Sequence, residues 1–185
     1  MIGARNPSCF LFFIWAPVSG ITDNIREQLL LPRLQAAVDG WDPLTERVPL
    51  HTWLQPWVPI LGSLMDPLYP TVRYKLSSCL QAWHPSDGSA RQMLKPWASV
   101  FARKDMTVLL SRSILPKLAM VLRELAVDPT QQDLAPFRWV VGWSDVVAPA
   151  DMARMLADHF FPKFTAALCD WLSQDGANLA EIAEW

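Results

Sequence analysis

Apolar residues recur at three- and four-residue steps along most of this chain. The first stripe lies between about residue 22 and Trp41, where Thr22 or Asp23 is the expected N-cap, and this spacing gathers its members on one face of a helix. No segment shows a sustained period-two alternation of apolar and polar residues. Even residues 137–141, the segment with the most β-forming side chains, occupy a helical position in the pattern. We therefore predict an all-α fold. The first stripe consists of Ile25, Leu29, Leu30, Leu34, Val38 and Trp41.

The helical pattern repeats about every 40 residues. A basic residue followed by an apolar one occurs at Arg33, Lys75, Lys117 and Lys163, at steps of 42, 42 and 46 residues. In each copy the apolar member is followed four positions later by another apolar residue, and three positions beyond that by a large one. A second phrase, Leu-x-Pro-aromatic, lies between these copies, at residues 54–57, 94–97 and 134–137. Such a two-phrase unit predicts a solenoid-like stack of helical hairpins, an architecture that commonly presents binding surfaces.

Prolines divide each unit in a regular way. Pro32, Pro116 and Pro162 stand just before the cation of their copies, inside the expected first helix, and an interior proline removes a backbone hydrogen bond and bends the helix. The second copy lacks this proline, and Pro70 opens its helix earlier. A further proline, Pro43, Pro85 or Pro129, ends the first helix in the first three copies, because the residue before proline is pushed out of helical space. In the Leu-x-Pro-aromatic phrase, the proline either begins a helix or bends a longer one.

Composition narrows the class of protein. The chain is 51% hydrophobic, holds ten Trp and is 18% charged, which excludes an intrinsically disordered chain. The net charge of −2 argues against gripping phosphate backbones by bulk electrostatics. Three widely separated cysteines fit a reduced intracellular setting. Residues 9–16 are apolar but too short to span a membrane, so we expect them to pack on the first hairpin, with a secretory signal as the alternative.

We predict neither an enzyme nor a cofactor or metal site. The three histidines, His51, His84 and His159, lie in different copies and lack metal-ligand spacing. Residues 84–87 bring His, Ser and Asp together, but turn and cap chemistry explains so short a loop better than a catalytic triad does. No glycine-rich phosphate loop is present.

Two sets of residues are candidates for packing or binding. Trp41, Trp57, Trp83 and Trp97 occupy repeated helical positions and are predicted to be core residues. The repeated cations can be solvated side chains whose stems cover apolar surface. Alternatively they form a basic ladder that receives an acidic peptide or a nucleic-acid backbone. That candidate interaction ladder consists of Arg33, Lys75, Lys117 and Lys163.

Several longer phrases point to a known family. Residues 30–34, 38–44, 49–57, 75–87 and 159–164 closely resemble the GC-rich-sequence DNA-binding-factor-like domain of the tuftelin-interacting protein family. The similarity assigns residues 15–185 to that helical repeat domain, truncated at its C-terminus. It leaves residues 1–14 as an atypical apolar N-terminal segment.

The resemblance implies a nuclear pre-mRNA splicing factor. Members of this family help to disassemble the intron-lariat spliceosome by recruiting and stimulating a DEAH-box RNA helicase through a G-patch segment. This sequence contains no G-patch, so the expected role is that of a non-catalytic scaffold that binds spliceosomal proteins. The alternative is a helical module that binds RNA or DNA directly. Binding to a membrane is not expected.

Overall fold

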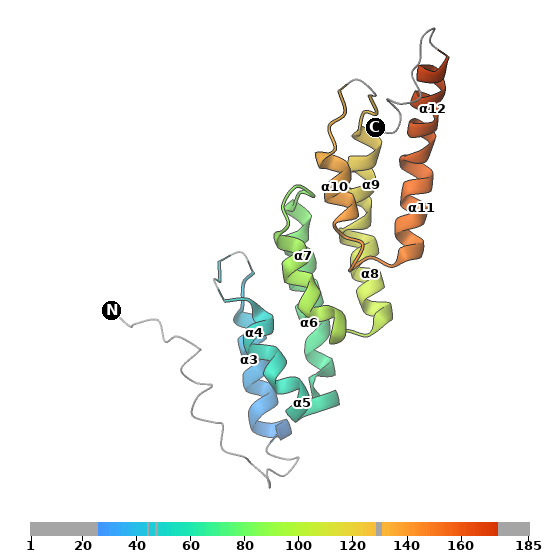
Figure 1. The fold of residues 1–185 in the computed structure, drawn as a ribbon. Coiled ribbons are helices and arrows are strands. Elements are labelled where there is room, and N and C mark those ends of the chain that lie inside the picture. The colour runs from blue at the N-terminus through green and yellow to red at the C-terminus, as the bar shows by residue number, and fades with distance from the viewer. Residues whose placement is uncertain (1–25, 44, 47, 129–130, 174–185) are drawn as a thin grey trace. The chain divides into compact units, whose positions relative to one another are not determined.

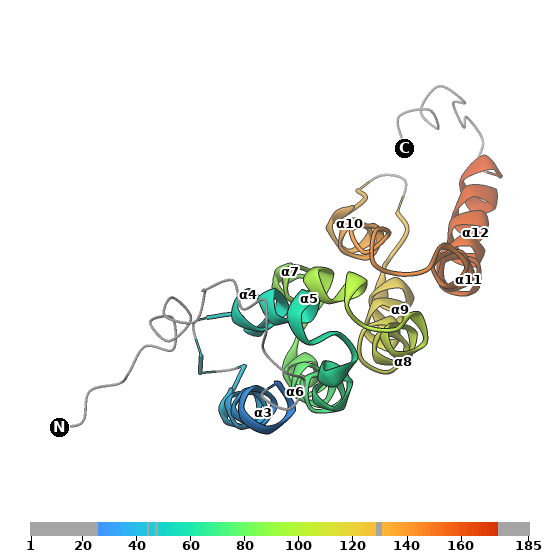
Figure 2. The ribbon, with the colours of Figure 1, turned by 90° about the horizontal axis from the view of Figure 1, so that it is seen from below.

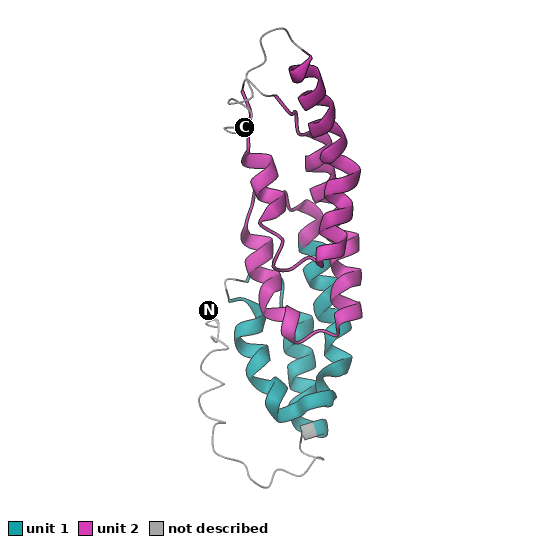
Figure 3. Ribbon diagram, turned by 45° about the vertical axis from the view of Figure 1, so that its right-hand side comes forward, with its two compact units in different colours: residues 1–79 teal, residues 80–185 magenta. Residues whose placement is uncertain are grey.

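The structure is a computed structural model, and it describes residues 26–173 except positions 44, 47, 129 and 130. Every regular element among these residues is a helix, as predicted (Figure 1). The chain forms two compact units, residues 1–79 and 80–185, and the boundary between them falls within one helix, α6 (Figure 3). The predicted segment 1–14, the proposed cap at Thr22 or Asp23 and residue Ile25 lie outside the described residues.

The first unit begins with a π-helix and a proline. Helix η1 spans Arg26–Leu30, and α3 follows as Leu31–Gly40, with Pro32 in its first turn. A π-turn adds a residue to the helical turn and so shifts the side-chain register. The predicted apolar stripe is therefore wrong at Leu29, which is 54% exposed, whereas Val38 and Trp41 are buried as expected.

Four short helical pieces follow, α4 (Leu50–Leu54), η2 (Gln55–Trp57), α5 (Val58–Leu61) and η3 (Gly62–Leu68), and then the longer α6 (Tyr69–Ala82), which crosses into the second unit. Elements α3 and η3 pack against each other. Gly62 has a φ of 53°, a left-handed conformation that glycine adopts at little cost where α5 ends. Helix α6 is uninterrupted, as predicted for the copy that lacks the interior proline.

The second unit continues with α7 (Ser89–Leu94), η4 (Lys95–Ser99), α8 (Arg103–Ser113), α9 (Leu115–Glu124), α10 (Ala135–Val141), α11 (Pro149–His159) and α12 (Phe161–Leu172). Helix α9 contacts α8, α10 and α11, and α11 contacts α12 (Figures 1 and 2). Residues 137–141 belong to α10, which confirms their helical assignment.

The bends predicted at Pro116 and Pro162 are complete breaks between two helices. Helix α8 ends before Ile114 and α11 ends before Phe160, and in each case a new helix starts with proline in its first turn. Proline lacks the N–H that would continue the earlier helix, and its fixed φ suits a first turn. The first helix of the fourth copy, expected to be one bent helix around Pro162, is therefore two helices, α11 and α12.

The Leu-x-Pro-aromatic phrase takes both of the forms left open by the sequence. At Pro56 and Pro96 a short α-helix continues as a 3-10 helix, whereas Pro136 lies in the first turn of α10. A 3-10 turn is a common continuation at the end of an α-helix.

The tryptophans predicted to form the core are largely buried. Trp41, Trp83 and Trp97 are between 1% and 8% exposed, and Trp97 stacks on Phe101 with ring centroids 5.0 Å apart. Trp57 is only half-buried, in a 3-10 turn, so its assignment to the core is wrong in part.

Candidate functional site: lysines at helix ends

Three of the four repeated cations, Lys75, Lys117 and Lys163, contact the end of an earlier helix. In the first unit, the Lys75 Nζ on α6 donates hydrogen bonds to the carbonyl oxygens of Asp39, at 2.6 Å, and Trp41, at 2.5 Å. These carbonyls belong to the end of α3 and its C-cap residue. The last carbonyls of a helix have no partner within the helix, and they carry the negative end of its dipole. An ammonium group is therefore a suitable cap.

In the second unit, Lys117 on α9 makes the same kind of contact at the end of α6. Its Nζ donates to the carbonyl oxygens of Leu80, Gln81 and Trp83, at 2.8, 2.7 and 2.5 Å. The same nitrogen lies 5.9 Å from the centroid of the Trp83 ring, within the range of a cation–π contact. An ammonium group has three protons, so three carbonyl acceptors satisfy it completely.

Lys163 on α12 repeats this arrangement at the end of α9. Its Nζ donates to the carbonyl oxygens of Leu122, at 3.2 Å, of Leu125, at 3.1 Å, and of Arg123. We call each of these three contacts a lysine clasp, meaning a lysine in the first or middle turns of one helix that donates to the terminal carbonyls of an earlier helix.

The three lysine clasps use the same positions. Each acceptor helix carries a repeated cation of its own, and the acceptor carbonyls lie five, six and eight residues after that cation. Lys117 and Lys163 bond to all three carbonyls, and Lys75 bonds to those at six and eight residues. This agreement means that the basic-apolar phrase encodes a contact between neighbouring copies. Sequence reasoning recognised the lysines but missed their acceptors; the constant eight-residue distance to Trp41, Trp83 or Leu125 was the available signal.

Three of the four residues of the candidate interaction ladder thus already donate hydrogen bonds to carbonyls of the same chain. Lys75, Lys117 and Lys163 are half-buried, and their ammonium groups bond to carbonyls. Arg33 is exposed, and among the described residues it has no recorded polar partner. Capture of an external ligand by this row stays a prediction.

The loop beyond each clasped helix end is held by a second polar contact. The indole N–H of Trp41 donates to the Val48 carbonyl at 3.2 Å, and that of Trp83 donates to the Asp87 carbonyl at 2.7 Å. The third copy has Leu125 in place of tryptophan.

In that third copy a glutamine side chain closes the loop. The Gln132 Oε1 accepts from the Asp128 N–H at 3.0 Å, and its Nε2 donates to the carbonyls of Ala126 and Asp133, at 3.1 and 2.9 Å. An amide side chain has both donors and acceptors, so it can replace an indole that only donates.

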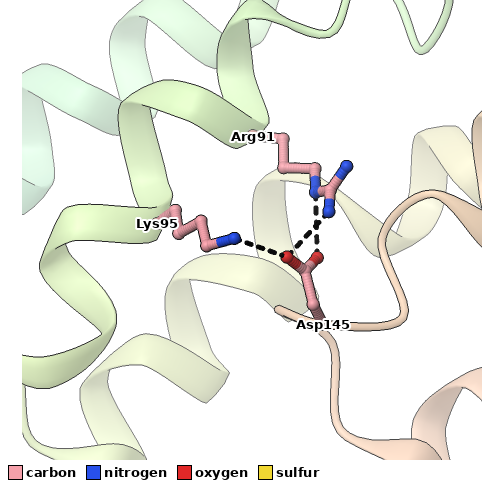
Figure 4. Close-up of polar contacts among 3 residues, drawn as sticks. All are labelled: Arg91, Lys95 and Asp145. Atoms are coloured by element: carbon pink, nitrogen blue, oxygen red, sulfur yellow. Dashed lines mark hydrogen bonds and ion pairs between the residues drawn. The ribbon is translucent and has the colours of Figure 1, made fainter.

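A polar cluster of three side chains joins α7 and η4 to the turn after α10 (Figure 4). The Arg91 guanidinium donates to Asp145 in a two-pronged arrangement, with Nε–Oδ1 at 2.9 Å and Nη2–Oδ2 at 2.8 Å. Lys95 Nζ lies 3.2 Å from the same Oδ2. The hydrogen bonds from Arg91, more than those from Lys95, lower the pKa of Asp145 to about 2. Because the cluster is solvent-exposed, we interpret it as a surface contact within the unit.

The His-Ser-Asp loop has the geometry of a turn. His84 Nδ1 and Ser86 Oγ are 2.8 Å apart, but the Asp87 carboxylate accepts from the backbone and hydroxyl of Ser89, at 2.8 and 2.6 Å. These bonds lower the pKa of Asp87. The rings of His84 and Trp139 lie nearly perpendicular, with their centroids 5.9 Å apart. The carboxylate is thus engaged by Ser89 and does not orient the imidazole.

The described part of the chain has neither a metal-binding cluster nor a helix that could span a membrane. Within residues 26–173 and outside the gaps, no group of three or more His, Cys, Asp or Glu side chains is placed to hold a metal ion. None of the helices in this part has the length and apolar character needed to cross a membrane.

Taken together, these features define an all-helical domain in which lysines close the ends of earlier helices. The chain belongs to the GC-rich sequence DNA-binding factor-like protein family, whose model matches residues 5–168.

The similar proteins are much longer than this chain. It is 46% identical over 173 residues to tuftelin-interacting protein 11 of Danio rerio, a match that covers 92% of the chain and 21% of that relative. The proteins of the same name in Bos taurus and Homo sapiens are each 44% identical, over 173 and 165 residues, and 20% of each is covered. The chain thus spans about a fifth of the length of these relatives.

Proposed function

We propose that this chain is a non-catalytic protein-interaction domain of a nuclear pre-mRNA splicing factor that takes part in spliceosome disassembly. Within it, residues 15–185 form a solenoid-like stack of helical hairpins with units of about 40 residues. The observation that carries the architecture is the agreement among the three lysine clasps, because equal contacts at equal positions are what stacked repeats produce.

The biological role rests on the family. The sequence resemblance and the family match, over residues 5–168, point to the tuftelin-interacting proteins, for which a splicing role is expected. The name of these relatives refers to an interaction with a protein, tuftelin, which fits an interaction domain. The proposed partners are spliceosomal proteins, and the DEAH-box helicase is a partner of longer family members that carry a G-patch.

A capture experiment tests this role. The full chain serves as bait in nuclear extract, and a helical domain of similar size and charge serves as the control bait. We expect late spliceosomal proteins to be recovered on this chain and not on the control bait. The recovered amounts are expected to be the same after nuclease treatment. Equal recovery on both baits contradicts the proposed function.

Direct RNA or DNA binding is the alternative, and it uses the candidate interaction ladder. A ligand on Lys75, Lys117 or Lys163 has to compete with carbonyl acceptors, so Arg33 is the informative member. Exposed Lys104 provides the matched control. If Arg33→Glu weakens binding of an RNA oligonucleotide, Lys104→Glu does not, and affinity falls steeply with salt, the alternative is supported. Identical binding by both variants contradicts it.

A further inference from the structure

Helix α3 begins like the helices of two lysine clasps, but its cation is exposed. Three helices start with an apolar residue, proline, a cation and a second apolar residue, at residues 31–34, 115–118 and 161–164. The clasp lysines are half-buried, whereas Arg33 has no recorded polar partner among the described residues. The acceptors of the clasps lie 34 to 41 residues before their lysine, and no residue of this sequence stands that far before Arg33.

The position four residues after the cation is also uncovered in α3. This residue is Ala37, which is exposed, whereas its equivalents Cys79 and Ala167 are half-buried and Val121 is 8% exposed. Residues four apart lie on the same face of a helix. Arg33 and Ala37 therefore belong to one face of α3 that is covered in the three other copies.

The next copy, in the first unit, shows what covers this face. Lys75, Ser78 and Cys79 of α6 line a hollow together with residues 41–43, the segment that follows the last turn of α3. Burial and, as the second cause, the Asp42 carboxylate raise the pKa of the Cys79 thiol, which agrees with this placement. The cation and the residues three and four positions after it thus face the end of an earlier helix.

We propose that the face of α3 around Arg33 and Ala37 is a docking site for the C-terminal end of another helix, supplied by a segment outside this sequence. That helix ends in a large apolar residue, a polar residue and proline, as at residues 41–43 and 83–85. The Arg33 guanidinium donates to its last carbonyls, and its final turn covers Ala37. This inference rests on the proposed function, since it adds one contact of the same kind to the same stack.

Charge and shape favour a helix end as the occupant. The last carbonyls of a helix lack partners within the helix and carry the negative end of its dipole, so they attract a cation. A guanidinium has five N–H donors and so can serve two or three carbonyls, as the clasp lysines do. Ala37 is as small as Ala167, its equivalent in the third clasp, so a helix end can approach α3 as closely. The competing occupants are a nucleic-acid backbone and a second copy of this chain.

A stapled peptide of residues 70–86 supplies the helix end in a binding test on the full chain. It contains Trp83-His84-Pro85, and the staple joins positions 74 and 78, which are exposed in the chain. Lys75→Gln removes the peptide's own clasp donor, Cys79→Ala prevents oxidation, and circular dichroism checks its helicity.

The chain is compared as unmodified protein and as Arg33→Met, with Arg112→Met as the matched control. Arg112 is exposed on α8, and no polar partner of it is recorded in the described part of the chain. We expect Arg33→Met to bind the peptide about tenfold more weakly than the other two, because methionine cannot donate to the carbonyls. Ala37→Glu is expected to weaken binding as well, since it places a carboxylate against them. Amide exchange at residues 36–40 is expected to slow when the peptide binds.

Other results overturn the inference. Equal affinity of Arg33→Met and Arg112→Met, no binding of the helical peptide, or protection confined to other helices each does so. Binding of an RNA oligonucleotide that Arg33→Met abolishes, without peptide binding, assigns Arg33 to nucleic acid instead. Sedimentation of the unmodified chain is expected to show a monomer, and a dimer that Arg33→Met dissociates assigns the face to a second copy. Capture of spliceosomal proteins without peptide binding removes this inference alone, whereas peptide binding without such capture removes the splicing role alone.

Discussion

The substitution Lys117→Met measures what one lysine clasp contributes to stability. Methionine keeps a long apolar stem, so the change removes chiefly the ammonium group and its bonds to the carbonyls of Leu80, Gln81 and Trp83. Two of these bonds are part-buried and one is exposed, so water replaces the donor only in part.

The expected loss follows from these contacts. A hydrogen bond to a charged group contributes about 1.5–3 kcal/mol, and a cation at a helix C-terminus contributes about 0.3–1 kcal/mol. The three bonds share one ammonium group and one desolvation cost, so they do not add. We expect Lys117→Met to lower the free energy of unfolding by about 2 kcal/mol, roughly a thirtyfold change in the folded-to-unfolded ratio.

The assay is urea unfolding of the full chain followed by tryptophan fluorescence, with Lys104→Met as the matched control. Lys104 is exposed on α8, and no polar partner of it is recorded among the described residues, so its substitution is expected to change stability by less than about 0.5 kcal/mol. If the two variants unfold with the same midpoint and slope, the clasp makes no net contribution and the reasoning is refuted.

Three other substitutions test separate contacts. Trp97→Ala removes a ring that is 1% exposed and stacked on Phe101, so calorimetry or urea unfolding should show a loss of about 3–5 kcal/mol; a loss below about 1 kcal/mol contradicts its place in the core. Asp145 has a folded pKa of about 2 against an ordinary 3.8, so its stabilising effect is present above pH 3.8 and is lost as pH falls toward 2. Asp145→Asn should flatten that part of the stability–pH profile, and an unchanged profile counts against the Arg91 contact. Gln132→Ala removes three hydrogen bonds from an exposed loop and should cost about 1 kcal/mol, with faster amide exchange at residue 128 as the specific sign; Gln131→Ala serves as its neighbour control.

Local chemistry accounts for what the sequence predicted well. The prolines that follow Ile114 and Phe160 within two residues interrupt the helix at the predicted positions, although as breaks and not as the expected bends. The burial of Val38, Leu80 and Leu122 follows from helical spacing. Such features need no knowledge of distant residues.

Features that depend on distant partners were not predicted. The acceptors of Lys117 lie 34 to 37 residues earlier, so its capping role was invisible until the helices were placed together. Leu29 is exposed and not part of the buried stripe, because the π-helix shifts the helical register of the side chains and has no clear sequence signature. The contact between Arg91 and Asp145 spans 54 residues, and neither residue belongs to a repeated phrase.

The lysine clasp also determines where this chain tolerates a change of length. In each of the three clasped helices the residue that follows the helix end lies eight residues after the cation of that helix, as Trp83 does after Lys75, whereas the steps between cations vary from 42 to 46. One residue inserted inside the eight-residue interval would rotate the terminal carbonyls by about 100° around the helix, away from the incoming ammonium group. Residues inserted in a connecting loop leave the acceptors in place. We therefore expect natural variation in length to gather in the loops, while the interval from cation to helix end stays constant.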